Sequence, residues 1–178
     1  MSEKDVHPVQ RKAALKGDYR VKKIRDSYKR RGWEVDNRPV NANGVDLVCY
    51  KKQKPNDPNA ICIDGEYYPS EIVKAFEITN WKKDSWMSIH RALDIIRNLN
   101  SEAKNQKVLH PKAYILKILV ISYSNNIEHI KLDLWMNNQV YIETYGYDEE
   151  PPSDEEEAVD GWVEHARKKK NKNRIVKE

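Results

Sequence analysis

The amino-acid sequence predicts a single mixed α/β domain. Its 178 residues are the length of one ordinary domain, or of one domain with a tail. Segments with apolar residues at helical spacing alternate with apolar runs of strand length, and this alternation is typical of a mixed sheet with helices. Hydrophobic residues make up 39% of the chain, a larger share than a fully disordered chain would contain.

The first predicted element is a basic helix over residues 19–31. Apolar side chains recur there at spacings of three and four residues, which places them on one face. Gly32 offers a C-terminal stop. We expect a short strand at Trp33–Val35 and a loop over residues 36–44. The apolar face of the helix consists of Val21, Ile24 and Tyr28.

Residues 45–79 predict a three-stranded antiparallel meander. The expected strands are Val45–Tyr50, Ala60–Ile63 and Ile72–Thr79, each a mostly apolar run. The connection over residues 51–59 contains two prolines and two asparagines, which indicates a long first turn.

The second half of the chain predicts a helix, a strand, a helix and a closing strand. The first helix covers Asp84–Asn98, and a buried strand follows at Tyr114–Tyr123. A helix over Ile127–Met136 and a strand over Val140–Tyr145 complete the domain. The stripe expected to face the core in the first of these helices consists of Trp86, Ile89, Leu93 and Ile96.

The composition divides the chain into four segments. Residues 1–15 are predicted as a polar leader, and residues 16–146 as the α/β domain. Residues 147–160 are an acidic linker or a capping loop. Residues 161–178 form a basic tail with seven Lys or Arg against two acids. A disordered tail and a tail ordered by packing both fit its few apolar residues.

The charge of the chain favours a polyanionic ligand. The formal net charge is +4, but residues 148–160 hold eight acids and no base, so the rest of the chain carries +12. A basic body of this kind favours nucleic acid as the partner. A lysine-rich surface kept for solubility is the alternative.

Membrane and secreted classes do not fit the sequence. Its longest apolar runs are far too short to span a bilayer, and its first ten residues lack the apolar core of a secretion signal. Cys49 and Cys62 lie in apolar runs and are expected to be buried free thiols. An intracellular, cytoplasmic protein is therefore expected.

Two acids in the predicted meander are the candidate chemistry. No glycine-rich phosphate loop, HExxH motif or Cys/His cluster is present. Asp46 opens one strand, and Glu77 lies inside a strongly apolar strand, where a charge is costly unless it is paired or bound to a cation. Two carboxylates on neighbouring strands would suit Mg²⁺ or Mn²⁺. The alternative places Glu77 on a solvent-facing side of its strand.

Three stretches of sequence, KGDYRVKKIRDSYKRRGWEV, NGVDLVCY and VKAFEITNW, follow one another in a recognisable order. A basic helix ends in a Gly-aromatic-x-Val step, an Asp follows on a strand, and a Glu lies on the next strand. This order resembles the PD-(D/E)XK nuclease superfamily, and within it the archaeal Holliday-junction resolvase-like proteins. The likeness covers about residues 16–100, with the later β-α-β segment as the usual completion of the core.

The resemblance implies a restriction-endonuclease-like core, in which helices flank a mixed central sheet. It implies a metal-dependent DNA endonuclease that hydrolyses phosphodiester bonds, branched DNA included, with Asp46 and Glu77 as ligands of Mg²⁺ or Mn²⁺. It also implies a homodimer, because a four-way junction presents two symmetric strands.

The sequence departs from the family at two places. The lysine usually found two residues after the second acid is Thr79, which can hydrogen-bond water but brings no cation to the reacting phosphate. Lys82, Lys83 and Arg91 are candidates to replace it, whereas strand alternation directs Lys74 to the opposite face. The glutamate often found in the first helix is also missing from its usual position.

The first helix supplies the candidate nucleic-acid contacts. Its bases are suited to phosphate oxygens, although a solvated helix face would have the same composition. Two other functions stay open: a DNA-binding protein of this fold with a decayed site, and an interaction module that uses the acidic segment. The candidate contacts are Arg20, Lys23, Arg30 and Arg31.

Overall fold

The computed structural model shows a five-stranded mixed sheet with helices on both faces. Its strand order is β1-β2-β3-β4-β5; β1, β2 and β3 pair antiparallel, and β3, β4 and β5 pair parallel. This confirms the mixed α/β class. The strands are β1 (Glu34–Val35), β2 (Leu47–Lys52), β3 (Glu71–Ile78), β4 (Tyr114–Ile121) and β5 (Val140–Thr144). The structure describes residues 8–36, 44–54, 56–58, 60–63, 67–79, 87–122, 132–146 and 149–151, with side chains from residue 19 onward.

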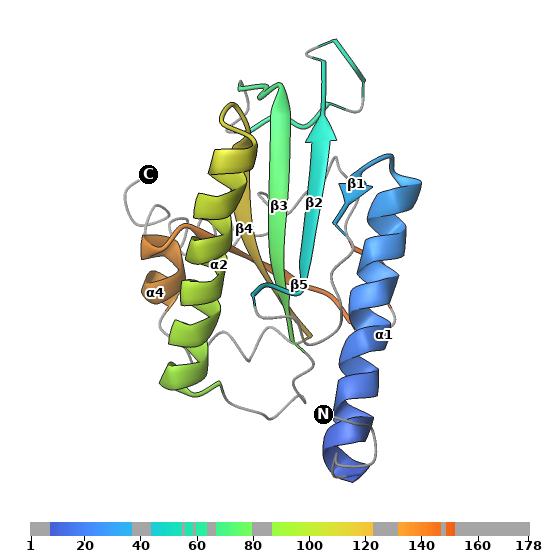
Figure 1. Cartoon of the computed structure of the whole chain (residues 1–178), viewed down its shortest axis with the longest axis vertical. Helices are drawn as coiled ribbons and strands as arrows, with labels where there is room; N and C mark the ends of the chain where they lie inside the picture. Colours follow the sequence, from blue (N-terminus) through green and yellow to red (C-terminus); the bar gives the residue numbers. More distant parts are fainter. Residues whose placement is uncertain are drawn as a thin grey trace, which may run out of the picture.

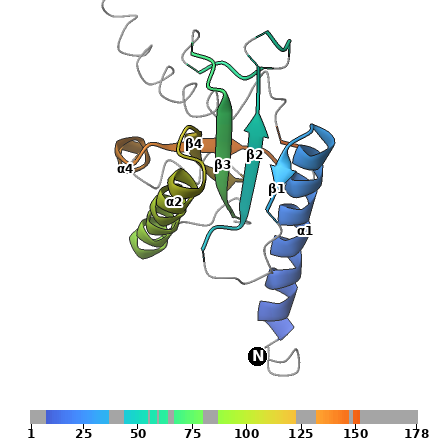
Figure 2. The same cartoon turned by 45° about the horizontal axis from the view of Figure 1, so that its top comes forward.

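The helices sandwich the sheet between two layers. They are α1 (Pro8–Arg30), α2 (Ile89–Leu109) and α4 (Leu132–Asn137). Figures 1 and 2 show α1 on one side of the sheet and α2 with α4 on the other. Helix α2 connects the parallel pair β3 and β4, as parallel strands require a crossover connection. Within the described part of the chain, no helix is long and apolar enough to cross a membrane.

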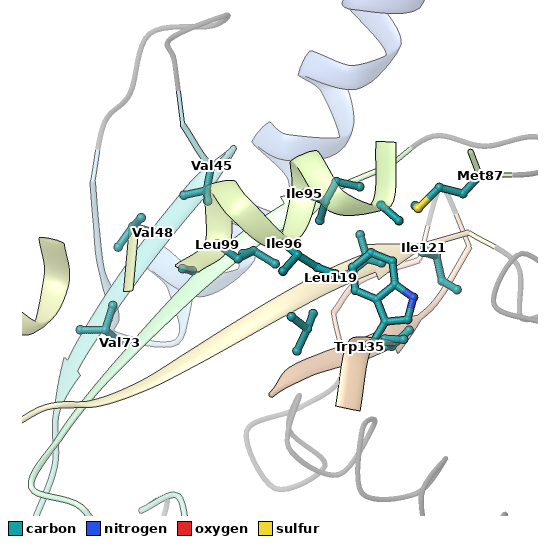
Figure 3. Close-up of a cluster of buried hydrophobic side chains, with 14 of the residues drawn as sticks. Val45, Val48, Val73, Met87, Ile95, Ile96, Leu99, Leu119, Ile121 and Trp135 are labelled. Atoms are coloured by element: carbon teal, nitrogen blue, oxygen red, sulfur yellow. The ribbon is translucent and has the colours of Figure 1, made fainter. Parts of the chain in front are cut away.

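Each face of the sheet builds its own core, because neighbouring residues of a strand point to opposite faces. Val73 and Ala75 of β3 pack into the cluster under α2 (Figure 3). Ile72 and Phe76 of the same strand pack into the cluster under α1. Figure 3 shows Trp135 of α4 among the side chains of the α2 cluster, so the short helix helps to cover that face.

Helix α1 is longer than expected and ends where expected. It begins at Pro8, so residues 8–15 belong to this helix. At its end, the N–H of Trp33 donates to the carbonyl of Tyr28 at 3.1 Å, and the N–H of Gly32 donates to Lys29 at 3.1 Å. These two bonds form a Schellman cap, and Gly32 has the positive φ of 87° that this cap requires.

The predicted strand at Ala60–Ile63 was wrong. Strand β2 pairs directly with β3, with Leu47 opposite Phe76 and Lys52 opposite Glu71, so nothing lies between them. The 60–63 segment makes only an isolated bridge, from Ile63 to Tyr67. Its isoleucines are nevertheless buried under α1, which explains the apolar run without a place in the sheet.

The predicted core face of α2 was also wrong, apart from Ile96. Ile89 and Leu93 are 56% and 42% exposed, and Trp86 lies outside the described residues. The apolar part of the packed face is formed instead by other side chains of α2, and the small side chain of Ala92 lets the helix approach the sheet closely. That apolar part consists of Ala92, Ile95, Ile96 and Leu99.

Candidate active site

Asp46 and Glu77 meet at one end of the β2–β3 ladder, on the face that α2 covers. The N–H of Asp46 donates to the carbonyl of Phe76 at 2.9 Å, which extends the ladder by one residue beyond β2. The side chain of Asp46 then accepts a hydrogen bond from the N–H of Ile78 at 2.8 Å. Because these contacts flank Glu77, they hold the Asp46 carboxyl beside the Glu77 carboxyl. The alternative in which Glu77 faces solvent is excluded, since Glu77 is only 3% exposed.

The two carboxyls form an electrostatically coupled pair. The pKa of Glu77 is raised to about 8, chiefly by burial and next by the neighbouring charge of Asp46. Although Asp46 is exposed as a residue, desolvation of its carboxyl also raises its pKa, against the lowering effect of its hydrogen bond from Ile78. Protonated Glu77 donates a hydrogen bond to Asp46. The metal-free pair therefore holds one proton at neutral pH, and the exposed Asp46 opens it to solvent.

Helix α2 adds a cation and an amide to this pair. Nη2 of Arg91 lies 3.9 Å from Oε2 of Glu77, and Nδ2 of Asn98 donates to Oε1 of Glu77 at 3.5 Å. Arg91 stands in the first turn of the helix, where its N–H donates to the side chain of Ser88 at 3.1 Å. The N-cap therefore fixes the turn that carries the cation. Both side chains lower the pKa of Glu77.

Arg91 is thus the one proposed replacement for the missing lysine that the described residues bring to the pair. Thr79 is buried, and its hydroxyl donates to the carbonyl of Val120 at 2.9 Å, so its proton is used to hold β3 against β4. Lys74 points to the opposite face, as expected, and its Nζ lies 3.1 Å from the hydroxyl of Tyr28. Lys82 and Lys83 lie outside the described residues.

Arg20 is not a surface contact for phosphate, and that prediction was wrong. It is 1% exposed, and its guanidinium donates to the carbonyls of Thr79 and Tyr145, the latter at 2.8 Å, and to the hydroxyl of Ser122. These acceptors follow β3, β4 and β5. Arg20 therefore fastens α1 across the ends of three strands, which helical spacing alone could not reveal.

Two of the other candidate bases, at the end of α1, meet the start of the acidic segment. The exposed Arg30 forms an ion pair with Glu150, and Arg31 donates to the carbonyl of Pro151. Lys23 is partly exposed. The chain after β5 therefore returns to the end of α1 and partly satisfies two of the arginines that the sequence assigns to nucleic acid.

The donor set fits a hard divalent cation. Mg²⁺ is commonly held by one or two carboxylates, with water and substrate phosphate completing its shell. Asp46 and Glu77 supply two such carboxylates at a solvent-open position, and the pKa values of both stay raised although Arg91 lowers them. No cluster of three or more His, Cys, Asp or Glu side chains suited to a metal occurs among the described residues.

Asn98 was missed by the sequence analysis. A signal for it was present, because Arg91 and Asn98 are seven residues apart and so lie on the same face of a helix. Comparison of the chain with family models, with curated proteins and with solved structures found no match.

Proposed function

We propose that this protein is a metal-dependent DNA endonuclease with a restriction-endonuclease-like core. The observation that carries this proposal is the Asp46–Glu77 pair at the end of two antiparallel strands, with Arg91 beside it. The element order supports it as well: a basic helix, an antiparallel meander, a crossover helix and a parallel strand follow one another as the sequence resemblance implies.

In this proposal Asp46 and Glu77 hold Mg²⁺ or Mn²⁺, and Glu77 gives up its proton when the ion binds. The bound ion supplies charge stabilisation for the scissile phosphate and lowers the pKa of a water. Asn98 orients the Glu77 carboxyl through its amide. Arg91, whose side chain is 48% exposed, can swing from Glu77 toward a phosphate oxygen and stabilise the charge that develops there.

The substrate in this proposal is DNA, branched DNA included, bound by a homodimer. The +12 charge of the chain outside residues 148–160 supports a polyanionic substrate. Two further functions each have one observation in their favour. The Thr79 hydroxyl donates its proton to the carbonyl of Val120, so that proton is not offered to a water at the acid pair. This favours a DNA-binding protein with a decayed site. The Arg30–Glu150 ion pair favours an interaction module in which the acidic segment competes for the basic surface.

The test is incubation of the purified protein with four-way junction, flap and duplex DNA in Mg²⁺, Mn²⁺ or EDTA. We expect cleavage that EDTA abolishes and that Asp46→Asn or Glu77→Gln reduces about a thousandfold. Asp94→Asn is the matched control, since Asp94 is an exposed acid of α2 whose partner is Arg97.

Each of the other outcomes selects a different function. Salt-dependent DNA binding without cleavage identifies the decayed protein, with a log–log slope of about −0.9 for each neutralised phosphate. No DNA binding at low salt identifies the interaction module. Cleavage that persists in EDTA or in Asp46→Asn contradicts the proposed metal site.

A further inference from the structure

A hollow of about 420 Å³ lies at the far end of the β2–β3 ladder from the acid pair. Three lysines from two segments converge on it: Lys52 at the end of β2 and Lys54 just after it, and Lys112 in the turn between α2 and β4. In Figure 1 the C-terminal ends of β2 and α2 both lie at the top of the molecule, with β3 between them. The rest of the lining is Gln53, Ser70 and Glu71.

The backbone around this hollow is held in place by buried hydrogen bonds. Gln53 is 7% exposed, and its amide donates to the carbonyls of Ile61 at 2.8 Å and Pro69 at 2.6 Å. On the other side, Nζ of Lys107 donates to the carbonyl of Ala113 at 2.9 Å, which secures the turn that carries Lys112. The lysines therefore project from a fixed frame and do not belong to a loose loop.

The hollow keeps a net positive charge, because three lysines line it against one acid. Lys52, Lys54 and Lys112 are exposed, and no described acid forms an ion pair with any of them. The one acid in the lining, Glu71, accepts a hydrogen bond from the hydroxyl of Tyr50. Three ammonium groups around one open hollow suit a phosphate group, which lysine binds as a point charge.

We propose that this hollow binds a backbone phosphate of the same nucleic acid that reaches the Asp46–Glu77 pair, an inference that rests on the proposed function. Asp46 and Lys52 are six residues apart on one extended segment, which corresponds to about 20 Å. Phosphates of one DNA strand advance about 3.4 Å per nucleotide along the helix axis. The hollow therefore contacts the duplex about six base pairs from the scissile phosphate.

Both positions lie on the same face of the sheet, as a continuous duplex track requires. Strand alternation places Glu71, Val73 and Glu77 on the side that α2 covers. Helix α2 runs between the two positions, with Arg91 in its first turn and Lys112 just beyond its end.

The test compares Lys52→Ala, Lys112→Ala and the double variant with Lys104→Ala in the full chain. Lys104 is an exposed lysine of α2. It lies one turn beyond Asn100, which contacts Asn138 next to α4. Affinity is measured by fluorescence anisotropy for a long duplex and for one shorter than six base pairs, in a salt series. Binding of inorganic pyrophosphate is measured in parallel by calorimetry.

For the long duplex we expect the double variant to reduce the salt slope by about one and to lose about tenfold in affinity, with a smaller loss in each single variant. Lys104→Ala and the short duplex should show no such loss. Equal losses in Lys112→Ala and Lys104→Ala would overturn the proposal. Pyrophosphate binding that requires Lys52 and Lys112, without an effect on DNA, would show a site for free phosphate compounds instead of a DNA contact.

Failure of the proposed function is separable from failure of this site. If the protein binds no DNA, the nuclease proposal and the duplex track both fail, and the pyrophosphate arm decides whether the hollow is an anion site. If DNA is bound and cleaved but the hollow variants behave like Lys104→Ala, only this inference fails.

Discussion

Two buried glutamates lie on opposite faces of one sheet, and they differ in the charged groups around them. Glu77 on the α2 face and Glu143 on the α1 face are 3% and 2% exposed. Burial is the main cause that raises the pKa of each, to about 8 for Glu77 and about 7 for Glu143. Glu77 has a second acid beside it, at a position open to solvent. Glu143 has Lys74 and Arg31 near it, which lower its pKa.

The difference shows how the surroundings of a buried carboxyl decide its role. Neither oxygen of Glu143 has a hydrogen-bond partner among the described groups, and the neighbouring Tyr28 and Tyr145 have pKa values raised chiefly by burial. Helix α1 closes this face, so the protonation of Glu143 affects the stability of the folded protein. The Asp46–Glu77 pair concentrates negative charge where a cation can enter, so the protonation of Glu77 affects the affinity for a cation. The predictions below test this contrast.

The largest expected effect comes from the residue that fastens α1 over the Glu143 face. Arg20→Met should lower the free energy of unfolding by about 4 kcal/mol, because it leaves several buried carbonyls without their donor. Urea denaturation measures this. Arg30→Met, at an exposed ion pair, should cost less than about 1 kcal/mol. Similar costs for the two variants would show that α1 does not depend on Arg20.

The second effect is a pH dependence of stability that Glu143 causes. Its pKa is about 7 in the folded protein against an ordinary value of 4.5, so the folded state holds a proton that the unfolded state has lost. Stability from this group is therefore complete below pH 4.5 and falls as the pH rises toward 7 and above. The loss amounts to about 3 kcal/mol at pH 8.

Glu143→Gln should remove the loss of stability that Glu143 causes at rising pH, as measured by urea denaturation from pH 5 to pH 8. Glu77 adds a fall of the same sign in the metal-free protein, because its pKa is raised as well. Saturating Mg²⁺ should remove the Glu77 part and leave the Glu143 part unchanged. A Glu143→Gln variant with the full wild-type slope would refute this assignment.

The third effect is the pH dependence of metal affinity. Mg²⁺ has to displace the proton of Glu77, so its affinity should rise about tenfold per pH unit from pH 6 and level off near pH 8. Calorimetry in buffers of different ionisation enthalpy would also detect the released proton. Glu143→Gln should leave this profile unchanged. An affinity that is flat between pH 6 and pH 8 would place the cation elsewhere.

The smallest effect concerns the acidic segment that meets α1. Deletion of residues 148–178 removes a net charge of −3 and frees Arg30 and Arg31 from Glu150 and Pro151. We expect DNA affinity to rise by about twofold at physiological salt, where charges are screened beyond about 8 Å. A fall in affinity would show that the basic tail at 161–178 is a clamp, and loss of folding would place the tail in the core.

The acid pair and the strand faces were predictable from sequence because they depend on local rules. Asp46 and Glu77 lie on strands that are neighbours in the chain, and the two-residue period of a strand places Glu77 and Lys74 on opposite faces. Gly32 was readable as a helix stop for the same reason, since the cap involves only adjacent residues.

The remaining features depend on contacts between distant parts of the chain. Arginine is a residue type that usually lies on the surface. The acceptors of Arg20 follow β3, β4 and β5, far from α1 in sequence. Glu143 looks like a polar position of an edge strand until α1 covers it. The 60–63 segment has the apolar content of a strand, but direct pairing of β2 with β3 takes its place in the sheet.

The most direct test of the acid pair as a cation site is Mn²⁺ binding measured by electron paramagnetic resonance at pH 8. The wild-type chain and Glu143→Gln should bind Mn²⁺ equally, Mg²⁺ should displace it, and Asp46→Asn and Glu77→Gln should lose the bound signal. Binding that survives in Glu77→Gln, or that disappears in a folded Glu143→Gln, would contradict the assignment of the two faces.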